Sequence, residues 1–485
     1  MKRREFLQRS MALAAVAAIG QDGERQPAAR PDVLFLSIED FSPHRLGCHG
    51  DPVCKSPNID AFAASGVRFD LAHCSASPCN PSRTSMLSGL RPATTGITGN
   101  TGAWNKILKP GSTLPEHFAA HGYETVRCGK MFHAGHGGET FGDKDRWTRI
   151  VAPNDDLPRI KSKRLPRQGP GIEYGKLRKE AAKRGEYLKG GSPFTYGPSG
   201  RDDSEEVDGR IAEQGIRILK QKQEKPLFLA LGFHSPHLPF CAPQEYFDMY
   251  ADVDVKLPKN PGSGPDGLPL DKTKTNKLNP YTVAGWKAAI VAHYAALSFV
   301  DAQVGRVLTA LRESGRDKNT IVVLWSDHGF MLGEHFLWRK GPLYDHSSMV
   351  AMMIRAPGVT SPNGICTRPT ESIDLFPTLC DLCGIPVPEG LEGISMRPLL
   401  ADPKRPWKKG AIITSGKRGR SIVTEAHRYN EYATKKGNIA RRQLFDRAKD
   451  PGEFTNLADQ PAHAETVARL SALLKGGWKA CLPEG

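Results

Sequence analysis

Chemically active side chains follow four apolar runs of the sequence, each at the point where a predicted strand ends. Runs 33–38, 125–128, 226–233 and 321–326 are apolar without alternation, which is typical of strands buried on both faces of a parallel sheet. The residues that come after these runs are Glu39 and Asp40, Lys130 and His133, His234 and His237, and Asp327 and His328. In open α/β sheets the ligand site lies beyond the carboxyl ends of the strands. We therefore expect these side chains to meet in one crevice.

A cysteine stands at the start of a predicted helix in the stretch CNPSRTSMLSG, residues 79–89. A helix N-terminus carries unpaired N–H groups and partial positive charge, so a cysteine there is placed to attack an anionic substrate. A buried structural thiol beside a turn is the alternative interpretation of a lone cysteine. Cys79 is therefore a candidate nucleophile whose assignment depends on what surrounds it.

The acids at two of the strand ends indicate a metal centre. Glu39, Asp40 and Asp327 offer oxygen ligands that suit calcium or magnesium better than zinc, with His328 as a less usual companion. A helix cap is the alternative for any one of these acids. Groups that carry positive charge or move protons would surround the metal ion: Lys130, His133, His237, Lys340 and Arg83. Such a pocket stabilises the charge that develops on a transferring phosphoryl or sulfuryl group.

Helical segments separate the predicted strands, as an α/β fold requires. Helices are predicted over 59–64, 113–122, 208–221 and 286–311. The predicted fold class is α/β, with a large mixed, mostly parallel sheet sandwiched by helices. A further helix is predicted around 375–383, so we interpret Cys380 and Cys383 as core residues, with a redox pair as the alternative.

Two regions depart from this alternation of strands and helices. Residues 138–205 are rich in Gly, Pro and basic side chains, and we interpret them as an insertion that is either a surface excursion or a substrate-facing loop. After Pro406, short strand-like pieces at 411–414, 421–424 and 443–446 precede a last helix. The predicted organisation is a catalytic domain over 30–405 and a smaller α+β subdomain over 406–485.

The amino-terminal residues 1–28 are predicted to be a cleaved export signal. Arg3 and Arg4 precede the apolar stretch 11–19, which is too short to span a bilayer, and together they resemble the twin-arginine signal of bacteria. We therefore expect a periplasmic or secreted protein without stable membrane insertion. The formal net charge of +15 favours an acidic partner, but no nucleic-acid-binding motif accompanies it, so nucleic acid is not expected.

An ordered set of short motifs resembles one enzyme family. Cys79 to Arg83 matches Cys-x-Pro-Ser-Arg, the signature of type I sulfatases of the alkaline phosphatase superfamily, whose cysteine is converted to formylglycine. SPNID at 56–60, SDHG at 326–329 and DPGEFTNL at 450–457 extend the match. Within the family the chain is most similar to iduronate-2-sulfatase and its bacterial relatives, through GKMFH at 129–133 and FHSPHLPF at 233–240. One departure is Glu39, where the family usually has aspartate.

The resemblance implies a sulfuric ester hydrolase that acts on a sulfated carbohydrate and is matured by a formylglycine-generating enzyme. It implies calcium held by Glu39, Asp40, Cys79, Asp327 and His328. The hydrated aldehyde at position 79 would attack sulfur, and His133 would take the proton of its second hydroxyl. The resemblance further implies that Arg83 and Lys130 hold the hydrate, and that His237 and Lys340 contact the sulfate.

Several alternatives stay open at this point. The residues do not decide whether His237 or Lys340 protonates the leaving oxygen, because that depends on reach and local pKa. The alternative functions are a small-molecule aryl or choline sulfatase, a phosphodiesterase of the same superfamily, and a glycan-binding protein with a vestigial pocket.

Overall fold

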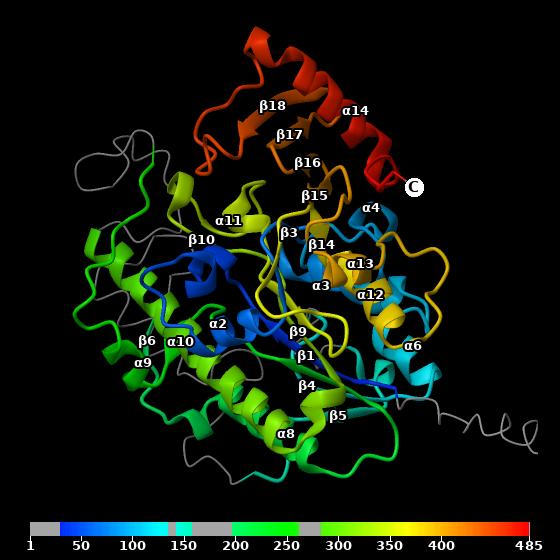
Figure 1. Cartoon of the computed structure of the whole chain (residues 1–485). Helices are drawn as coiled ribbons and strands as arrows, with labels where there is room; N and C mark the ends of the chain where they lie inside the picture. Colours follow the sequence, from blue (N-terminus) through cyan, green and yellow to red (C-terminus); the bar gives the residue numbers. More distant parts are fainter. Residues whose placement is uncertain (1–29, 134–141, 158–195, 261–282, 485) are drawn as a thin grey trace, which may run out of the picture.

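A twisted eight-stranded sheet forms the centre of the molecule, in the strand order β13-β2-β12-β9-β1-β7-β4-β5 (Figure 1). The structure is a computed structural model, and it describes residues 30–133, 142–157, 196–260 and 283–484. The strands are β1 (Asp32–Ile38), β2 (Val67–Phe69), β4 (Glu124–Gly129), β5 (Arg149–Val151), β7 (Leu227–Gly232), β9 (Thr320–Ser326), β12 (Met352–Arg355) and β13 (Gly364–Cys366). Only β12 pairs antiparallel with its neighbours, so the predicted mixed, mostly parallel sheet is confirmed.

Alternate residues of the central strands face two separate cores. In β1, Leu34 and Leu36 pack into one core, and Val33 and Phe35 pack into the other. Both sets are buried because helices cover both faces of the sheet, which explains why the run is apolar without alternation. The first core includes residues of α2 (Pro57–Ala64), α8 (Val207–Lys220) and α10 (Val283–Glu313). The second includes residues of α3 (Cys79–Ser88), α6 (Leu114–Ala120) and α12 (Leu375–Leu382), which lie across the sheet in Figure 1.

The predicted helices form close to their expected positions because their sequences carry start and stop signals. Thr113 and Glu116 make a reciprocal capping box at the start of α6, and Gly384 follows α12 with a positive φ of 62°. Cys380 and Cys383 are buried in α12 and at its end, which confirms their interpretation as core residues. Burial raises the pKa of both thiols to about 12. All ten cysteines are free, so the described chain contains no disulfide.

The helix α10 is long and apolar enough to cross a membrane by length and composition alone. Seventy-two per cent of its apolar window is buried inside the protein. It packs against α8, α2 and α9 (Gln244–Asp248), so its apolar character is accounted for as a core helix.

The C-terminal residues form a separate four-stranded antiparallel sheet of β15 (Ala411–Ser415), β16 (Gly419–Val423), β17 (His427–Ala433) and β18 (Ile439–Asp446). The helix α14 (Ala464–Ala480) packs on one face of this sheet, and the whole unit stands at the top of Figure 1. Sequence analysis identified three of these strands but not β17, whose residues HRYNEYA are mostly polar. The domain boundary at residue 405 remains a prediction.

The region interpreted as an insertion is partly integrated into the sheet. Its strand β5 pairs in parallel with β4, and its Arg146 is buried in an ion pair with Glu116. Arg149 pairs with Glu124. The buried Arg146 therefore stabilises the fold, whereas the Arg149 pair is partly exposed to solvent. Residues 138–141 and 158–195 of this region, and the predicted signal at 1–28, lie outside the described residues.

Candidate active site and metal centre

Four neighbouring strands end at one edge of the sheet and bring the predicted site residues together. In the order β9, β1, β7 and β4, the strands are adjacent and parallel. Their carboxyl ends lead into Asp327 and His328, Glu39 and Asp40, His234 and His237, and Lys130 and His133. The expectation that residues remote in sequence meet beyond the strand ends is confirmed by the contacts below.

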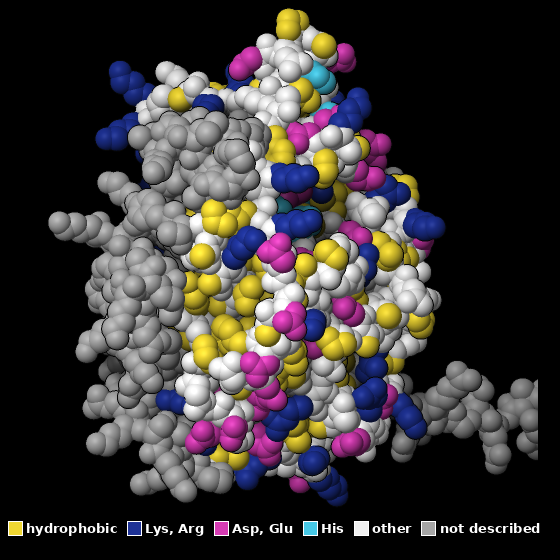
Figure 2. Space-filling view, turned by 90° about the vertical axis from the view of Figure 1, so that its left-hand side faces the viewer, with side chains coloured by type: hydrophobic (Ala, Val, Ile, Leu, Met, Phe, Trp, Pro, Cys, Tyr) yellow, Lys and Arg dark blue, Asp and Glu magenta, His cyan; other side chains and the backbone are white. Residues whose placement is uncertain are grey.

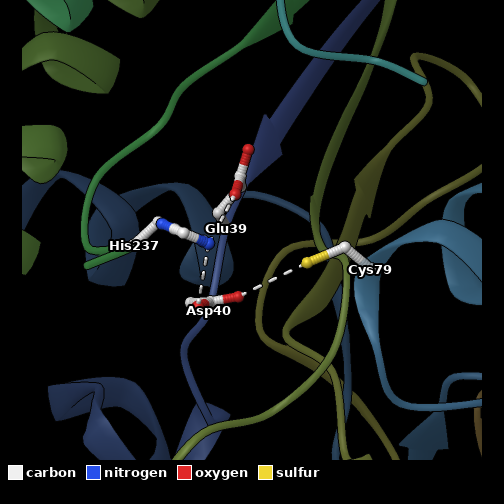
Figure 3. A group of neighbouring side chains, drawn as sticks. All are labelled: Glu39, Asp40, Cys79 and His237. Carbon is white, nitrogen blue, oxygen red and sulfur yellow. Dashed lines mark hydrogen bonds and ion pairs between the residues drawn. The ribbon is translucent and has the colours of Figure 1, made fainter. Parts of the chain in front are cut away.

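Cys79 is the first residue of α3 and is 1% exposed. Its Sγ lies 2.9 Å from Lys340 Nζ, 3.2 Å from His328 Nε2 and 3.8 Å from Asp40 Oδ1. Figure 3 shows Asp40 between Cys79 and His237, with Glu39 beside it. The thiol therefore points into the cluster of charged residues. This position favours a nucleophile over a structural thiol beside a turn.

The three carboxylates are buried, and each has its own cation. Lys130 Nζ lies 2.7 Å from Glu39 Oε1, and Arg83 Nε lies 2.9 Å from Asp327 Oδ2. Lys340 pairs with Asp40 through its ammonium group. Burial of three negative charges at one point is tolerated because these cations compensate them.

Arg83 connects several segments of the site through hydrogen bonds. It is fully buried, and besides Asp327 it donates to Ser37 Oγ at 3.2 Å and to the carbonyl oxygens of Lys130 and Met131 at 2.9 and 3.0 Å. The planar guanidinium can serve these directions at once, which an ammonium cannot. Arg83 therefore links α3 to the ends of β1, β4 and β9.

The fields of these groups shift their protonation. Burial would raise the pKa of the Cys79 thiol, but Lys340 and other cations hold it below its usual value. Burial likewise opposes ionisation of Glu39, yet Lys130 and His237 bring its pKa down to about 2. Burial would lower the pKa of Lys340, but Asp40 and the Cys79 sulfur raise it well above its ordinary value. The Glu39 carboxylate and the Lys340 ammonium group are thus both charged at neutral pH.

Two histidines stand at the edge of the cluster. His237 is 36% exposed at its side chain, and its Nε2 lies 3.7 Å from Asp40 Oδ2 and 3.9 Å from Glu39 Oε2. Burial and neighbouring Lys130 lower the pKa of His133 to about 3, so its ring is neutral at physiological pH. Among the described residues no hydrogen-bond partner reaches His133 Nδ1. His133 is therefore a neutral ring beside the cluster, and the His237 side chain is partly open to solvent.

Three further residues, none of them among the predicted catalytic or metal-ligating residues, support this arrangement: His234, Asp208 and Ser347. His234 Nδ1 lies 3.9 Å from Glu39 Oε1, and the backbone N–H groups of His234 and Ser235 each donate to Asp208 at 2.7 Å. Ser347 accepts a hydrogen bond from the N–H of Gly341, which follows Lys340, at 3.0 Å. Acidic residues such as Asp208 are common in the first turn of a helix. The sequence therefore did not predict that Asp208 accepts hydrogen bonds from His234 and Ser235.

The buried ligand atoms fit a hard divalent cation. Two overlapping groups each lie within 4.8 Å, namely Glu39, Asp40, Cys79 and His237, and Asp40, Cys79, Asp327 and His328. Three carboxylates dominate this donor set, as calcium and magnesium prefer. His328 Nδ1 lies 2.8 Å from the carbonyl oxygen of Gly329, so its Nε2 is the atom turned toward Asp40 and Cys79. His237, assigned from sequence to catalysis, is also within reach of a cation.

Comparison with known proteins places the chain in a family. Residues 31–385 match the family model described as Sulfatase, and residues 333–478 match the model described as N-sulphoglucosamine sulphohydrolase, C-terminal. The chain belongs to the sulfatase family, and it is a sulfatase. A sulfatase of Formosa agariphila is 30% identical over 98% of this chain and 92% of its own length. Iduronate 2-sulfatase of Mus musculus is 30% identical over 74% of this chain and 69% of its own length.

Solved structures share the fold. A protein solved in complex with its substrate D-glucosamine-2-N,6-O-disulfate has a TM-score of 0.71 and 19% identity, with 93% of this chain and 98% of that chain covered. The phosphonate monoester hydrolase of Agrobacterium radiobacter has a TM-score of 0.73 and 24% identity, with 94% and 96% covered. These neighbours confirm the predicted alkaline phosphatase-like architecture. Because their sequence identity to this chain is below 25%, they show a shared fold and not a shared activity.

Proposed function

We propose that this sulfatase removes sulfate from a sulfated carbohydrate, in the manner of iduronate-2-sulfatase, through a formylglycine made from Cys79 and a bound calcium ion. The observation that carries the proposal is the position of Cys79 Sγ, which lies at the start of α3 within 4 Å of Lys340, His328 and Asp40. A nucleophile at that point reacts beside the cation site, where negative charge on the sulfuryl group is stabilised.

Calcium would be held by Glu39, Asp40, Asp327 and His328 together with the modified residue 79. When bound, it would supply a fixed positive charge for the sulfate oxygens. Formylglycine would supply a hydroxyl nucleophile that a cysteine lacks. Both groups are proposed on the donor set and on the intact Cys-x-Pro-Ser-Arg sequence.

The chain's own residues divide the remaining work. Lys340 Nζ and His237 Nε2 lie on the Asp40 side of the site and are placed to contact the sulfate and the leaving oxygen. Neutral His133 is the candidate acceptor of the proton released at residue 79. Arg83 and Lys130 keep the nucleophile and the carboxylates in register. Whether Lys340 or His237 donates the final proton is left to mutagenesis of each.

The carbohydrate assignment is supported by relatives whose names include an iduronate 2-sulfatase. Its alternatives are an aryl or choline sulfatase and a phosphodiesterase of the same superfamily. A phosphodiesterase is the weaker alternative because its relatives in the superfamily mostly use Thr or Ser with zinc, whereas the described site offers a cysteine. The cell compartment is proposed from the N-terminal sequence as periplasmic or extracellular, after twin-arginine export. A formylglycine-generating enzyme is the proposed maturation partner, and neither nucleic acid nor membrane insertion is part of the proposal.

The deciding experiment is peptide mass spectrometry of residue 79 in active protein, combined with sulfate-release assays. We expect the Cys79 peptide to carry an aldehyde or its hydrate, and Cys79→Ala to release no sulfate. Fully active protein with an unmodified thiol would refute the mechanism.

A substrate panel should contain sulfated disaccharides from heparin, dermatan and algal sources, with an aryl sulfate and choline sulfate as controls. We expect the highest kcat/KM on a glycan. Faster turnover of the aryl or choline ester than of every glycan would leave the sulfatase conclusion standing but overturn the carbohydrate assignment.

A further inference from the structure

Two turns at one end of the C-terminal sheet carry clustered cations. The turn at 416–418 joins β15 to β16, and the turn at 434–438 joins β17 to β18. Because these strands form an antiparallel meander, both turns lie at the same end, and the N–H of Ala433 donates to the carbonyl oxygen of Arg418 at 2.9 Å. The exposed cations at this end are Lys417, Arg418, Lys435, Lys436 and Arg441.

This end of the sheet lies against the loop that carries Lys340. Ser415, the residue before the first turn, donates its hydroxyl to the carbonyl oxygen of Gly341 at 2.6 Å. Leu343 packs in one small core with Ile413 and Val423. The turn at 416–418 therefore lies next to the segment that carries Lys340, and the hydrogen bond from Ser415 to Gly341 joins the two.

Arg441 lies on the face of the sheet that meets the catalytic domain. Tyr429 and Leu444 are paired across β17 and β18 and face α14. Tyr432 and Arg441 are also paired, but three residues further along each strand, so side-chain alternation puts them on the opposite face. The Arg441 guanidinium lies 4.0 Å from the centre of the Tyr432 ring, and Tyr432 packs against the core of Leu343.

No carboxylate of the described residues neutralises these cations, although Arg441 packs on the Tyr432 ring. Within the described ranges, none of the five forms an ion pair with a carboxylate, whereas the adjacent Arg420 pairs with Glu431 at 3.3 Å. Lys and Arg side chains are visible at the upper end of the molecule, at the height of this subdomain (Figure 2). Clustered like charges repel each other, so an anionic ligand at this end relieves a repulsion as well as making new contacts.

We infer that Lys417, Arg418, Lys435, Lys436 and Arg441 bind the sulfate and carboxylate groups of a glycan chain beyond the sugar whose ester is cleaved. The inference rests on the proposed carbohydrate substrate and extends it to an anionic oligosaccharide of several residues. Such a ligand fits because its charges repeat along the chain and because the turn at 416–418 adjoins the segment that carries Lys340. Arg441, held flat by Tyr432, offers a preorganised fork for one sulfate or carboxylate.

The test compares a turn variant with a matched control. The turn variant combines Lys417→Gln, Arg418→Gln, Lys435→Gln and Lys436→Gln, with Arg441→Gln made separately. The control removes four exposed cations at the amino end of the sheet, away from the site, by Lys220→Gln, Lys222→Gln, Lys225→Gln and Lys318→Gln. Binding of a heparin octasaccharide is measured for each protein, together with kcat and KM on an aryl sulfate and on each glycan that the wild type hydrolyses.

We expect the turn variant to bind the octasaccharide about tenfold more weakly, since several exposed charge contacts of modest strength are lost together. Its KM for an oligosaccharide should rise by a similar factor with kcat unchanged. Its kinetics on the aryl sulfate, and all properties of the control variant, should match the wild type. Arg441→Gln alone should show a smaller loss in the same direction.

The outcomes separate this inference from the proposed function. Equal octasaccharide binding by wild type and turn variant overturns the inference, even if the wild type hydrolyses sulfated glycans. Failure of the wild type to hydrolyse any glycan refutes the carbohydrate assignment. If, in addition, the turn variant binds the octasaccharide as tightly as the wild type does, the inferred glycan-binding surface is also refuted. A single-stranded DNA of equal charge that binds as tightly and weakens equally would mean that the turns attract any polyanion, which also overturns the glycan assignment.

Discussion

Asp327 accepts three hydrogen bonds within the site, in addition to offering an oxygen to a metal ion. Its Oδ1 accepts hydrogen bonds from the backbone N–H groups of Asp40 and His328 at 3.1 and 3.0 Å, and its Oδ2 accepts from Arg83. One carboxylate thus orients two neighbouring ligands and one buried guanidinium. Loss of this side chain should therefore affect metal binding and folding together.

Asp327→Asn is expected to lower sulfate release by more than about 100-fold, equivalent to about 2.7 kcal/mol, because the amide keeps the shape but loses the charge. Asp327→Ala should in addition lower the free energy of unfolding by about 3–5 kcal/mol, since Arg83 is left buried without its partner. Calcium titration calorimetry and chemical denaturation measure the two effects. Wild-type calcium affinity and activity in Asp327→Asn would contradict the assignment.

Glu39 is the residue at which the chain departs from the usual aspartate, and it is held by Lys130 at 2.7 Å. Glu39→Asp should retain calcium binding with reduced affinity, because the shorter side chain keeps the charge but draws back from Lys130. Glu39→Ala should lose activity almost entirely and leave Lys130 without its partner. Calorimetric calcium affinity distinguishes the two variants. Equal affinities would mean that Glu39 serves the fold and not the metal ion.

At the scale of elements, the short helix α11 (Asp345–Ser348) supports two catalytic segments at once. Ser347 accepts from the N–H of Gly341 through its hydroxyl and from the N–H of Gly329 through its carbonyl, both at 3.0 Å. Gly341 follows Lys340 and Gly329 follows His328. Asp345 at the start of α11 is in turn held by Arg428 and Arg447 from the C-terminal subdomain.

Ser347→Ala is expected to lower kcat about tenfold with a smaller change in KM, because the N–H of Gly341 then keeps only Ser77 Oγ, at 3.2 Å, as a hydroxyl acceptor, while the backbone of α11 stays in place. Steady-state kinetics and the thermal unfolding midpoint should be measured together. Ser314→Ala, which removes a hydroxyl at the end of α10, is the control. A lowered midpoint with unchanged kcat would assign Ser347 to stability alone.

The elements that sequence analysis identified are those whose signals are local. The runs that became β1, β7 and β9 are continuous apolar stretches, and acids or histidines of the site follow each of them closely, so strand ends and site could be predicted together. The strand β17 was missed because its polar residues are buried by contacts with remote segments. Asn430, for example, donates to the carbonyl oxygen of Leu343 at 3.0 Å. The support from α11 was missed for the same reason, since it exists only through pairings between distant parts of the chain.

For the whole molecule, buried neutral histidines set the response to acid. Burial lowers the pKa of His73 to about 3 and that of His49 to about 4. Between these values and the ordinary pKa near 6.5, the unfolded chain binds more protons than the folded one. Stability contributed by these histidines is therefore complete above pH 6.5 and is lost as pH falls below it. Burial raises the pKa of Glu453 to about 7 and of Asp301 to about 6, which acts in the opposite sense.

We expect the free energy of unfolding to fall between pH 6.5 and 4.5, with His73 contributing about 2 kcal/mol of the loss. His73→Asn should flatten this part of the pH profile, whereas His463→Asn near the C-terminal helix should leave it unchanged. Denaturant unfolding at several pH values tests both variants. A profile equally steep in wild type and His73→Asn would contradict the role given to His73.

The contacts of the C-terminal residues also determine how late in synthesis the surroundings of Cys79 are completed. Glu453 accepts from the N–H of Asp345 at 2.7 Å, so the segment that carries Lys340 is completed by residues near the end of the chain. About 370 residues separate Cys79 from Glu453, which ribosomes synthesise in roughly 20–75 s. Throughout that interval the contact between Asp345 and Glu453 is absent, so the segment that carries Lys340, a neighbour of Cys79, lacks part of its support. The proposed conversion of Cys79 therefore has a window set by the length of the chain that follows it, and a variant truncated before residue 450 should keep that window open.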